Sequence, residues 1–223
     1  MSLKALFLNC TLKKSPEVSN TETFIKTAEK IFHELDVNTE RLRVVDYNIK
    51  FGNSSDEKNG DEWPEILAKI KASDIFIIAT PVWRGDRSSV SKIVAERLDG
   101  IWSDTNEDNG QFSSYNKVGG VMVDGNEDGA KKAISSIVFD LSEHGFTVPV
   151  NAFTYYVGKA GPGPSYIEAE GEKHFFTNKM TFFMVHNLVH LAKILKENPY
   201  PTSIKKLTER AKKISSKESI PDE

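Results

Sequence analysis

Five short runs of apolar residues along the chain have the length and composition of β-strands. The run Ile75–Ala79 is the clearest, because its uncharged and mostly β-branched residues suit a strand that is buried on both faces. Pro81 follows and is expected to end that strand, since proline has no N–H group for the ladder. The other predicted strands are Leu3–Leu8, Val118–Val123, Phe146–Val157 and the half-polar Arg41–Ile49, which is expected near a sheet edge.

Apolar residues at helical spacing fill the intervals between these runs. From Val90 to Ile101 they recur every three or four residues, which predicts a helix with one buried face. Ser19 and Glu22 have the spacing of a capping box, so another helix is predicted to begin at about Asn20. The remaining predicted helices are Asp61–Lys71, Ala130–Leu141, His174–Glu197 and a charged surface helix with a frayed tail over residues 201–223.

This alternation of strands and helices predicts a doubly wound α/β fold with a parallel sheet, and no domain break is evident before about residue 200. Ligands of such sheets bind beyond the carboxyl ends of the strands. The loops that follow the strands are therefore the expected location of binding chemistry.

Composition favours a small-molecule partner in a reducing cytoplasm. The 29 Lys and Arg residues against 32 Asp and Glu residues give a net charge of −3, which provides no basic field for nucleic acid. The single cysteine, Cys10, excludes an internal disulfide framework and a thiolate metal cluster. The apolar part of the N-terminus is too short for a signal peptide, and no segment is expected to span a membrane. His174–Glu197 is apolar nearly all round, so we expect its outer side to pair with another subunit in a homodimer or homotetramer.

The loop from Asn9 to Thr21 is the first candidate binding site. A phosphate needs backbone N–H donors at a helix N-terminus together with hydroxyl or cationic side chains. The sequence has neither G-x-x-x-x-G-K-[ST] nor G-x-G-x-x-G after the first strand, so such a site would be built from hydroxyls instead of glycines. The alternative is that these hydroxyls only cap the helix. The candidate phosphate ligands are Thr11, Lys13, Ser15, Ser19, Asn20 and Thr21.

Together with a second loop, this segment resembles the flavodoxin-like NAD(P)H-dependent FMN reductases, a family that includes quinone, azo and chromate reductases. Asn9 to Thr21 is similar to the family's FMN-phosphate loop, and Thr80–Gly85 is similar to its T-P-x-[YW]-x-G loop along the isoalloxazine. Lys92 with Glu96-Arg97 is similar to the K-x-x-x-D-R that follows in the family. The resemblance covers roughly residues 3–165. It implies a five-stranded sheet in the order 2-1-3-4-5 with helices on both faces, and an FMN-binding domain over residues 1–200. Residues inserted before Ser19 leave open which of Lys13, Lys14 and Ser15 would contact the phosphate.

A flavin ring needs a flat aromatic neighbour and backbone donors for its pyrimidine edge. Trp83 and the amides near Arg84 and Gly85 could provide both, whereas the alternative is that Trp83 is a core aromatic. The loop after the fourth strand could present amides to the N1/C2 edge, or it could be only a helix-capping turn. Its acidic residues Asp124, Glu127 and Asp128 would oppose negative charge there, so we expect them to point outward. The predicted contacts on these two loops are Pro81, Val82, Trp83, Arg84, Gly85, Asp124, Gly125 and Asn126.

No protein nucleophile, acid–base pair or metal is required by this interpretation, since the chemistry would be carried by flavin N5. His186 and His190 have metal-capable i, i+4 spacing, but no third ligand is evident. Cys10 is interpreted as a small buried residue, although a helix N-terminus nearby could lower its pKa.

The predicted function is an FMN-dependent oxidoreductase that passes hydride from NADPH or NADH, through the flavin, to a small acceptor. The acceptor would be a quinone, a nitro or azo compound, a metal ion or another flavin. Two alternatives stay open: a flavodoxin-type electron carrier without a substrate of its own, and a non-flavin α/β domain that binds another phosphate ligand.

Overall fold

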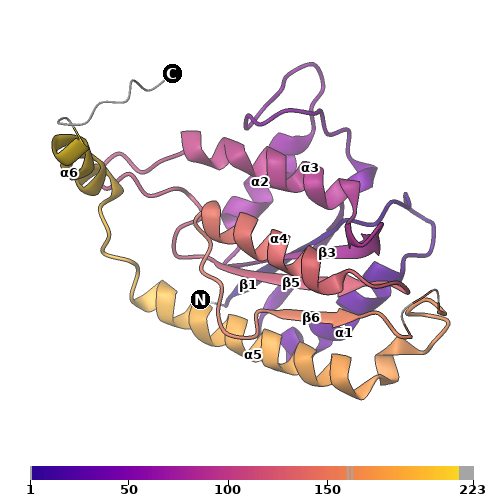
Figure 1. Ribbon diagram of the computed structural model, residues 1–223. Coiled ribbons are helices and arrows are strands. Elements are labelled where there is room, and N and C mark those ends of the chain that lie inside the picture. Colours follow the sequence, from indigo (N-terminus) through magenta and orange to yellow (C-terminus); the bar gives the residue numbers. More distant parts are fainter. Residues whose placement is uncertain (1, 160, 162, 216–223) are drawn as a thin grey trace.

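The computed structural model describes residues 2–159, 161 and 163–215, which form a parallel sheet between two helical layers (Figure 1). The parallel strands lie in the order β2-β1-β3-β5-β6, which is 2-1-3-4-5 when the parallel strands alone are counted. The predicted flavodoxin-like fold class is therefore confirmed. The strands are β1 (Lys4–Asn9), β2 (Asn38–Arg43), β3 (Ile75–Trp83), β5 (Val118–Asp124) and β6 (Phe153–Tyr156).

β3 does not end at Pro81 as predicted, but continues to Trp83 and turns back into the short antiparallel strand β4 (Asp86–Arg87). Cys10 donates its N–H to the carbonyl of Ala79 at 2.8 Å, so the backbone polar groups of Ala79 point toward β1. Those of Pro81, two residues later in the strand, point to the same side. β1 has already ended at Asn9, so the missing N–H of Pro81 removes no bond from the ladder.

The two outer strands are shorter than predicted. β2 ends at Arg43, because the chain turns into the 3₁₀ helix η1 (Val44–Asp46), in which Val44 is buried. β6 begins only at Phe153, and residues 146–152 contribute one isolated bridge between Thr147 and Val118. Pro149 and the left-handed Asn151, at φ 49°, break the intervening run.

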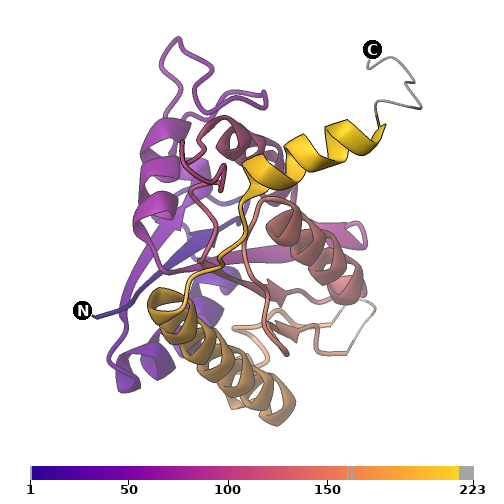
Figure 2. The same cartoon turned by 90° about the vertical axis from the view of Figure 1, so that its left-hand side faces the viewer.

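Two apolar clusters fill the core, one on each face of the sheet. α1 (Asn20–Glu34) and α5 (Phe175–Glu197) cover one face. α2 (Trp63–Ala72), α3 (Ser89–Leu98) and α4 (Ala130–Glu143) cover the other, as Figures 1 and 2 show. Side chains of β3 alternate between the two clusters, as expected for a strand buried on both faces. Two further 3₁₀ helices are η2 (Asp99–Ser103) and η3 (Gly171–Lys173).

α5 buries one face against the sheet and leaves a group of phenylalanines on its outer side. These exposed side chains are Phe175, Phe176, Phe182 and Phe183. The expected pairing with another subunit stays a prediction. None of the helices in the described residues combines the length and apolar character that a membrane crossing requires.

The last described helix, α6 (Ile204–Ser215), buries none of its residues and lies apart from the sheet (Figure 2). The segment that precedes α6 is hydrogen-bonded to the surface loop at residues 104–116. The Gln111 amide donates to the carbonyls of Tyr200 and Thr202 at 2.8 and 2.9 Å. The division into residues 1–200 and 201–223 stays a prediction, and residues 216–223 of the predicted tail lie outside the described residues.

Candidate functional site

The carboxyl ends of β1, β3, β5 and β6 meet at one edge of the sheet, and the loops that follow them are bonded to one another (Figure 1). Ser88, at the start of α3, donates its hydroxyl proton to the carbonyl of Cys10 at 2.7 Å, which links the first loop to the second. Asn126 and Gly163 exchange two bonds, of 2.9 and 3.2 Å, which link the loop after β5 to that after β6. The structure thus brings the three predicted loops together.

The first loop ends on the N-terminus of α1. Ser19 is the N-cap, and its hydroxyl accepts the N–H of Glu22 at 3.1 Å. This is half of the predicted capping box, because the Glu22 carboxylate is paired with Arg43 and Arg41 instead. Asn9, at the end of β1, supports the loop with its side chain, whose Oδ1 accepts the Thr11 N–H at 3.1 Å.

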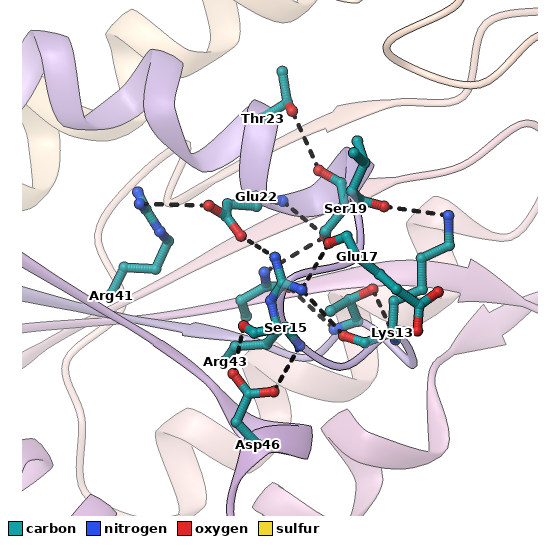
Figure 3. Close-up of polar contacts among 12 residues, drawn as sticks. Lys13, Ser15, Glu17, Ser19, Glu22, Thr23, Arg41, Arg43 and Asp46 are labelled. Carbon is teal, nitrogen blue, oxygen red and sulfur yellow. Dashed lines mark hydrogen bonds and ion pairs between the residues drawn. The ribbon is translucent and has the colours of Figure 1, made fainter.

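A clamp from β2 and η1 holds the middle of this loop (Figure 3). Arg43 donates to the carbonyls of Glu17 at 2.8 Å and of Lys13 at 3.4 Å. Ser15 gives both its N–H and its hydroxyl proton to the carboxylate of Asp46, at 2.9 and 2.7 Å. Both hydrogen-bond donors of Ser15, its N–H and its hydroxyl group, are therefore already paired with a carboxylate.

The two lysines of the loop are directed elsewhere. The Lys13 ammonium group donates to the carbonyl of Val18 at 3.3 Å, within the same loop (Figure 3). Lys14 lines a separate cavity. The predicted phosphate ligands nearest the helix start are buried hydroxyls, those of Thr11, Ser19 and Thr21. Asn20 accepts the Ile167 N–H at 2.9 Å, which ties the segment after β6 to α1.

The second loop is the hairpin between β3 and β4. Its two central residues, Arg84 and Gly85, have φ of 53° and 74°, as a two-residue type I′ turn requires. Val82 points into the core, whereas Trp83 is 51% exposed, so Trp83 is not a core aromatic. The Arg84 N–H is donated to Glu127 at 3.1 Å.

The third loop packs its glycines directly under the hairpin. A Cβ atom on Gly125 would lie 2.9 Å from Cβ of Val82, and one on Gly129 would lie 2.5 Å from the carbonyl carbon of Gly85. Asp128 is exposed and accepts the Gly129 N–H at 2.8 Å. The close approach of the two loops therefore depends on the absence of side chains at both glycines.

Gly129→Ala is expected to lower the free energy of unfolding by about 2 kcal/mol, because backbone strain and overpacking act together there. The φ of Gly129 is 131°, and the atoms that a methyl group would meet belong to the backbone of Gly85. The control is Gly85→Ala, since the φ of Gly85, 74°, is also positive but nothing lies within 4 Å of the added Cβ. Urea unfolding of the two variants would measure the difference in stability. Equal losses in the two variants would contradict the steric explanation.

Asp124 does not point outward as expected. It is the last residue of β5, is 3% exposed, and its Oδ1 has no hydrogen-bond partner. Burial raises the pKa of its carboxyl group to about 7, an effect that a hydrogen bond from Thr21 only partly offsets. The third loop thus directs an acid toward α1 and not toward solvent.

Two other candidates lack the surroundings for chemistry. Cys10 is buried, and desolvation raises the pKa of its thiol, so no thiolate is available to react. His186 and His190 are exposed on α5. In the described part of the chain, no group of three or more His, Cys, Asp or Glu residues is arranged to hold a metal ion.

A cavity of about 470 Å³ adjoins the first loop on the α3 side of the sheet. Leu12 and Lys14 form one wall, Val90 and Ile93 of α3 form another, and the segment from Val44 to Ile49 closes it with Glu62. This cavity lies beside the predicted phosphate loop, and its lining combines apolar side chains with Lys14, Asp46 and Glu62.

The sequence interpretation missed the residues that hold the loops in place, namely Asn9, Arg43, Asp46 and Ser88. Asn9, Arg43 and Asp46 belong to segments that the sequence predicts only as strand or loop, and their partners Ser19, Glu17 and Ser15 lie 10, 26 and 31 positions away. Ser88 alone had a local signal, because its hydroxyl caps α3 by accepting the Ser91 N–H at 3.2 Å.

The sheet order and the clustering of three loops at its carboxyl edge define a flavodoxin-like α/β protein. A model of the NADPH-dependent FMN reductase family matches residues 3–161. The chain therefore belongs to the NADPH-dependent FMN reductase family.

Two curated proteins and one solved structure are similar over most of the chain. The 8-demethyl-8-aminoriboflavin-5′-phosphate synthase of Streptomyces davaonensis is 40% identical, over 96% of this chain and 87% of that enzyme. The divalent metal cation transporter MntH of Mycobacterium bovis is 41% identical over 87% of this chain, which spans only 29% of the transporter's length. The crystal structure of RosB with bound 8-demethyl-8-formylriboflavin-5′-phosphate has a TM-score of 0.88 at 39% identity, over 96% of this chain and 88% of that one.

Proposed function

We propose that the protein binds FMN at the carboxyl edge of the sheet and passes electrons from NADPH or NADH to a small acceptor. The observation that carries this proposal is that the hydroxyl-lined start of α1 and the exposed indole of Trp83 are held on bonded, adjacent loops. The family match over residues 3–161 supports FMN as the flavin.

The start of α1 fits the phosphate end of FMN. The N–H groups of Asn20 and Thr21 have no acceptor within the helix, because they belong to its first turn. Together with the positive end of the helix dipole, they favour an anion there. The hydroxyls of Thr11 and Ser19 would add donors, whereas the Thr21 hydroxyl already donates to Asp124 and Ser15 is held by Asp46, so these two would contribute little.

The hairpin and the third loop fit the ring end of FMN. Trp83 offers a flat apolar surface that is half exposed, and Gly85, where an added Cβ would meet nothing within 4 Å, lets the backbone approach a planar ligand closely. The bound flavin would supply the hydride chemistry, so the protein's part is to orient the ring and to limit access of water. Gly125 and Asn126 would line the pyrimidine edge.

A second candidate function follows from the synthase relative. Its name and the ligand of the RosB structure describe a riboflavin phosphate that is changed at position 8 of the ring. At 40% identity over 96% of this chain, the same kind of flavin modification is a candidate here, with FMN as substrate instead of cofactor.

An anaerobic reduction and a separate incubation in air distinguish these functions. Absorbance of the FMN-loaded protein is recorded before and after addition of NADPH or NADH, and the flavin is then extracted for mass spectrometry. Bleaching of the band near roughly 450 nm with an unchanged flavin mass supports the reductase. A changed mass after incubation in air with candidate amine donors supports flavin modification. A bound flavin that neither bleaches nor changes would support an electron carrier, and failure to bind FMN would overturn both proposals.

A further inference from the structure

Asp124 lies below the first turn of α1, on the face of the sheet that this helix covers. Met122, two residues earlier on β5, belongs to the cluster beneath α1 and α5, and side chains two apart in a strand share a face. The hydroxyl of Thr21, in the first turn of α1, interacts with the Asp124 carboxyl group. The carboxyl group is therefore directed at the place where we propose that the phosphate binds.

The surroundings of Asp124 are neutral. On the neighbouring strands it stands beside Pro81 of β3 and Tyr156 of β6. Tyr166, in the segment after β6, packs edge-on against Tyr156, with ring centroids 5.2 Å apart. Two further titratable groups interact with this pair. Glu172 interacts electrostatically with Tyr166, and the ring centroid of His174 is 5.5 Å from that of Tyr156.

No cation among the described residues compensates the carboxyl group. The charged residue next to Thr21 on α1, Glu22, is turned to Arg43. Oδ1 of Asp124 has no partner, although 97% of the residue's surface is removed from solvent. A buried polar atom without a hydrogen-bond partner is unfavourable, so its position beside the proposed phosphate site is explained by a partner that arrives with the ligand.

We propose that Asp124 donates a hydrogen bond from its carboxyl group to the phosphate of FMN at the start of α1, and that phosphate binding consequently takes up a proton in mildly alkaline solution. This inference rests on the proposed FMN site. A carboxylate and a phosphate dianion repel each other, whereas a carboxylic acid gives the phosphate one more donor. Binding of the phosphate therefore favours the protonated acid.

The direction of the pH effect follows from linkage. With a pKa of about 7, Asp124 carries its proton below neutrality and binds the phosphate without any change in protonation. Above neutrality the free protein has lost the proton and must recover it on binding, so FMN binding weakens as pH rises. The second ionisation of a phosphate monoester lies near pH 6, so above pH 7 the phosphate itself is already dianionic.

The test is a fluorescence-quenching titration of the full chain, freed of flavin, with FMN and with riboflavin between pH 7 and pH 9. We expect the Kd for FMN to rise by up to about tenfold per pH unit, and the Kd for riboflavin, which lacks the phosphate, to change less than about twofold. Calorimetry in two buffers of different ionisation enthalpy should show uptake of up to one proton with FMN above pH 7.5 and none with riboflavin.

Two variants sharpen the result. Asp124→Asn keeps a donor but cannot titrate, so its Kd for FMN should be flat over this range. Asp128→Asn removes an exposed acid from the same loop and should retain the wild-type slope. A flat FMN curve with the wild-type chain, or an unchanged slope in Asp124→Asn, would overturn this inference alone. Failure of FMN to bind even at pH 7 would overturn the proposed function as well, so the two failures are distinguishable.

Discussion

Replacing Arg97 by methionine is expected to lower the free energy of unfolding by about 3–5 kcal/mol. The Arg97 side chain, at the end of α3, is 0% exposed, as is that of its partner Asp61, to which its Nη2 is bonded at 2.7 Å. The same guanidinium donates to the carbonyls of Lys50 at 2.8 Å and of Ser54 at 2.9 Å. Methionine would leave the buried Asp61 carboxylate without its cation and would remove the bonds to both carbonyls.

The loss is large because Asp61 would keep its charge without its cation. Burial by itself disfavours the carboxylate, but the Arg97 guanidinium and three backbone N–H groups outweigh this effect and hold the pKa of Asp61 well below its usual range. Without Arg97, the segment from Lys50 to Asp61 loses its main attachment to α3. This segment continues directly from Asn48 and Ile49, which line the cavity beside the first loop, so the cavity wall is expected to loosen too.

Urea unfolding of the flavin-free chain measures this effect, and an exposed ion pair on the same helix provides the control. Lys92 pairs with Glu96 at 3.4 Å with both side chains about half exposed, so Lys92→Met should cost less than about 0.5 kcal/mol. Replacing both buried partners, in Arg97→Met with Asp61→Asn, should recover part of the loss, because no unpaired charge remains and the amide oxygen still accepts backbone N–H groups. A loss below about 1 kcal/mol in Arg97→Met would refute the anchoring role.

The arrangement of the core could be predicted from the sequence because it depends on local periodicity. Ile75–Ala79 is a strand buried on both faces, as predicted, and its side chains alternate between the two apolar clusters. The end of the same strand was predicted wrongly. Whether Pro81 removes a hydrogen bond from the sheet depends on how far β1 extends beside it, and the length of β1 is set elsewhere in the chain. Strand boundaries depend on neighbours that the local pattern does not specify.

The candidate site was predictable as a set of loops but not in the direction of each side chain. The residue types of the first loop suggested phosphate ligands, yet Ser15 faces Asp46, a partner 31 positions away that no local pattern indicates. The outward direction expected for Asp124 was based on its charge. Side chains two residues apart in a strand share a face, so the buried Met122 indicates that Asp124 lies on the α1 face. At the end of a buried strand, this alternation predicts the direction of a side chain better than its charge does.

The burial of Asp124 leads to a second large effect, on the stability of the flavin-free protein. The pKa of its carboxyl group is about 7 in the folded chain against the ordinary value of 3.8, and this gap corresponds to about 4 kcal/mol. Because the folded-state pKa is the higher one, the folded chain holds the proton more tightly than the unfolded chain does. Its contribution to stability is complete below about pH 4 and is lost progressively as pH rises to about 7.

Asp124→Asn removes this titration while keeping the size and shape of the side chain. The stability of the variant relative to the wild-type chain should therefore rise by about 4 kcal/mol between pH 4 and pH 7.5 and stay constant above that. Urea unfolding across this range measures the difference, in which the titrations common to both chains cancel. Asp128→Asn, on the exposed part of the same loop, should show no such trend. A difference that does not change with pH would mean that Asp124 keeps its ordinary pKa in the folded protein. It would then be a buried carboxylate at neutral pH and would repel the phosphate that the start of α1 is proposed to bind.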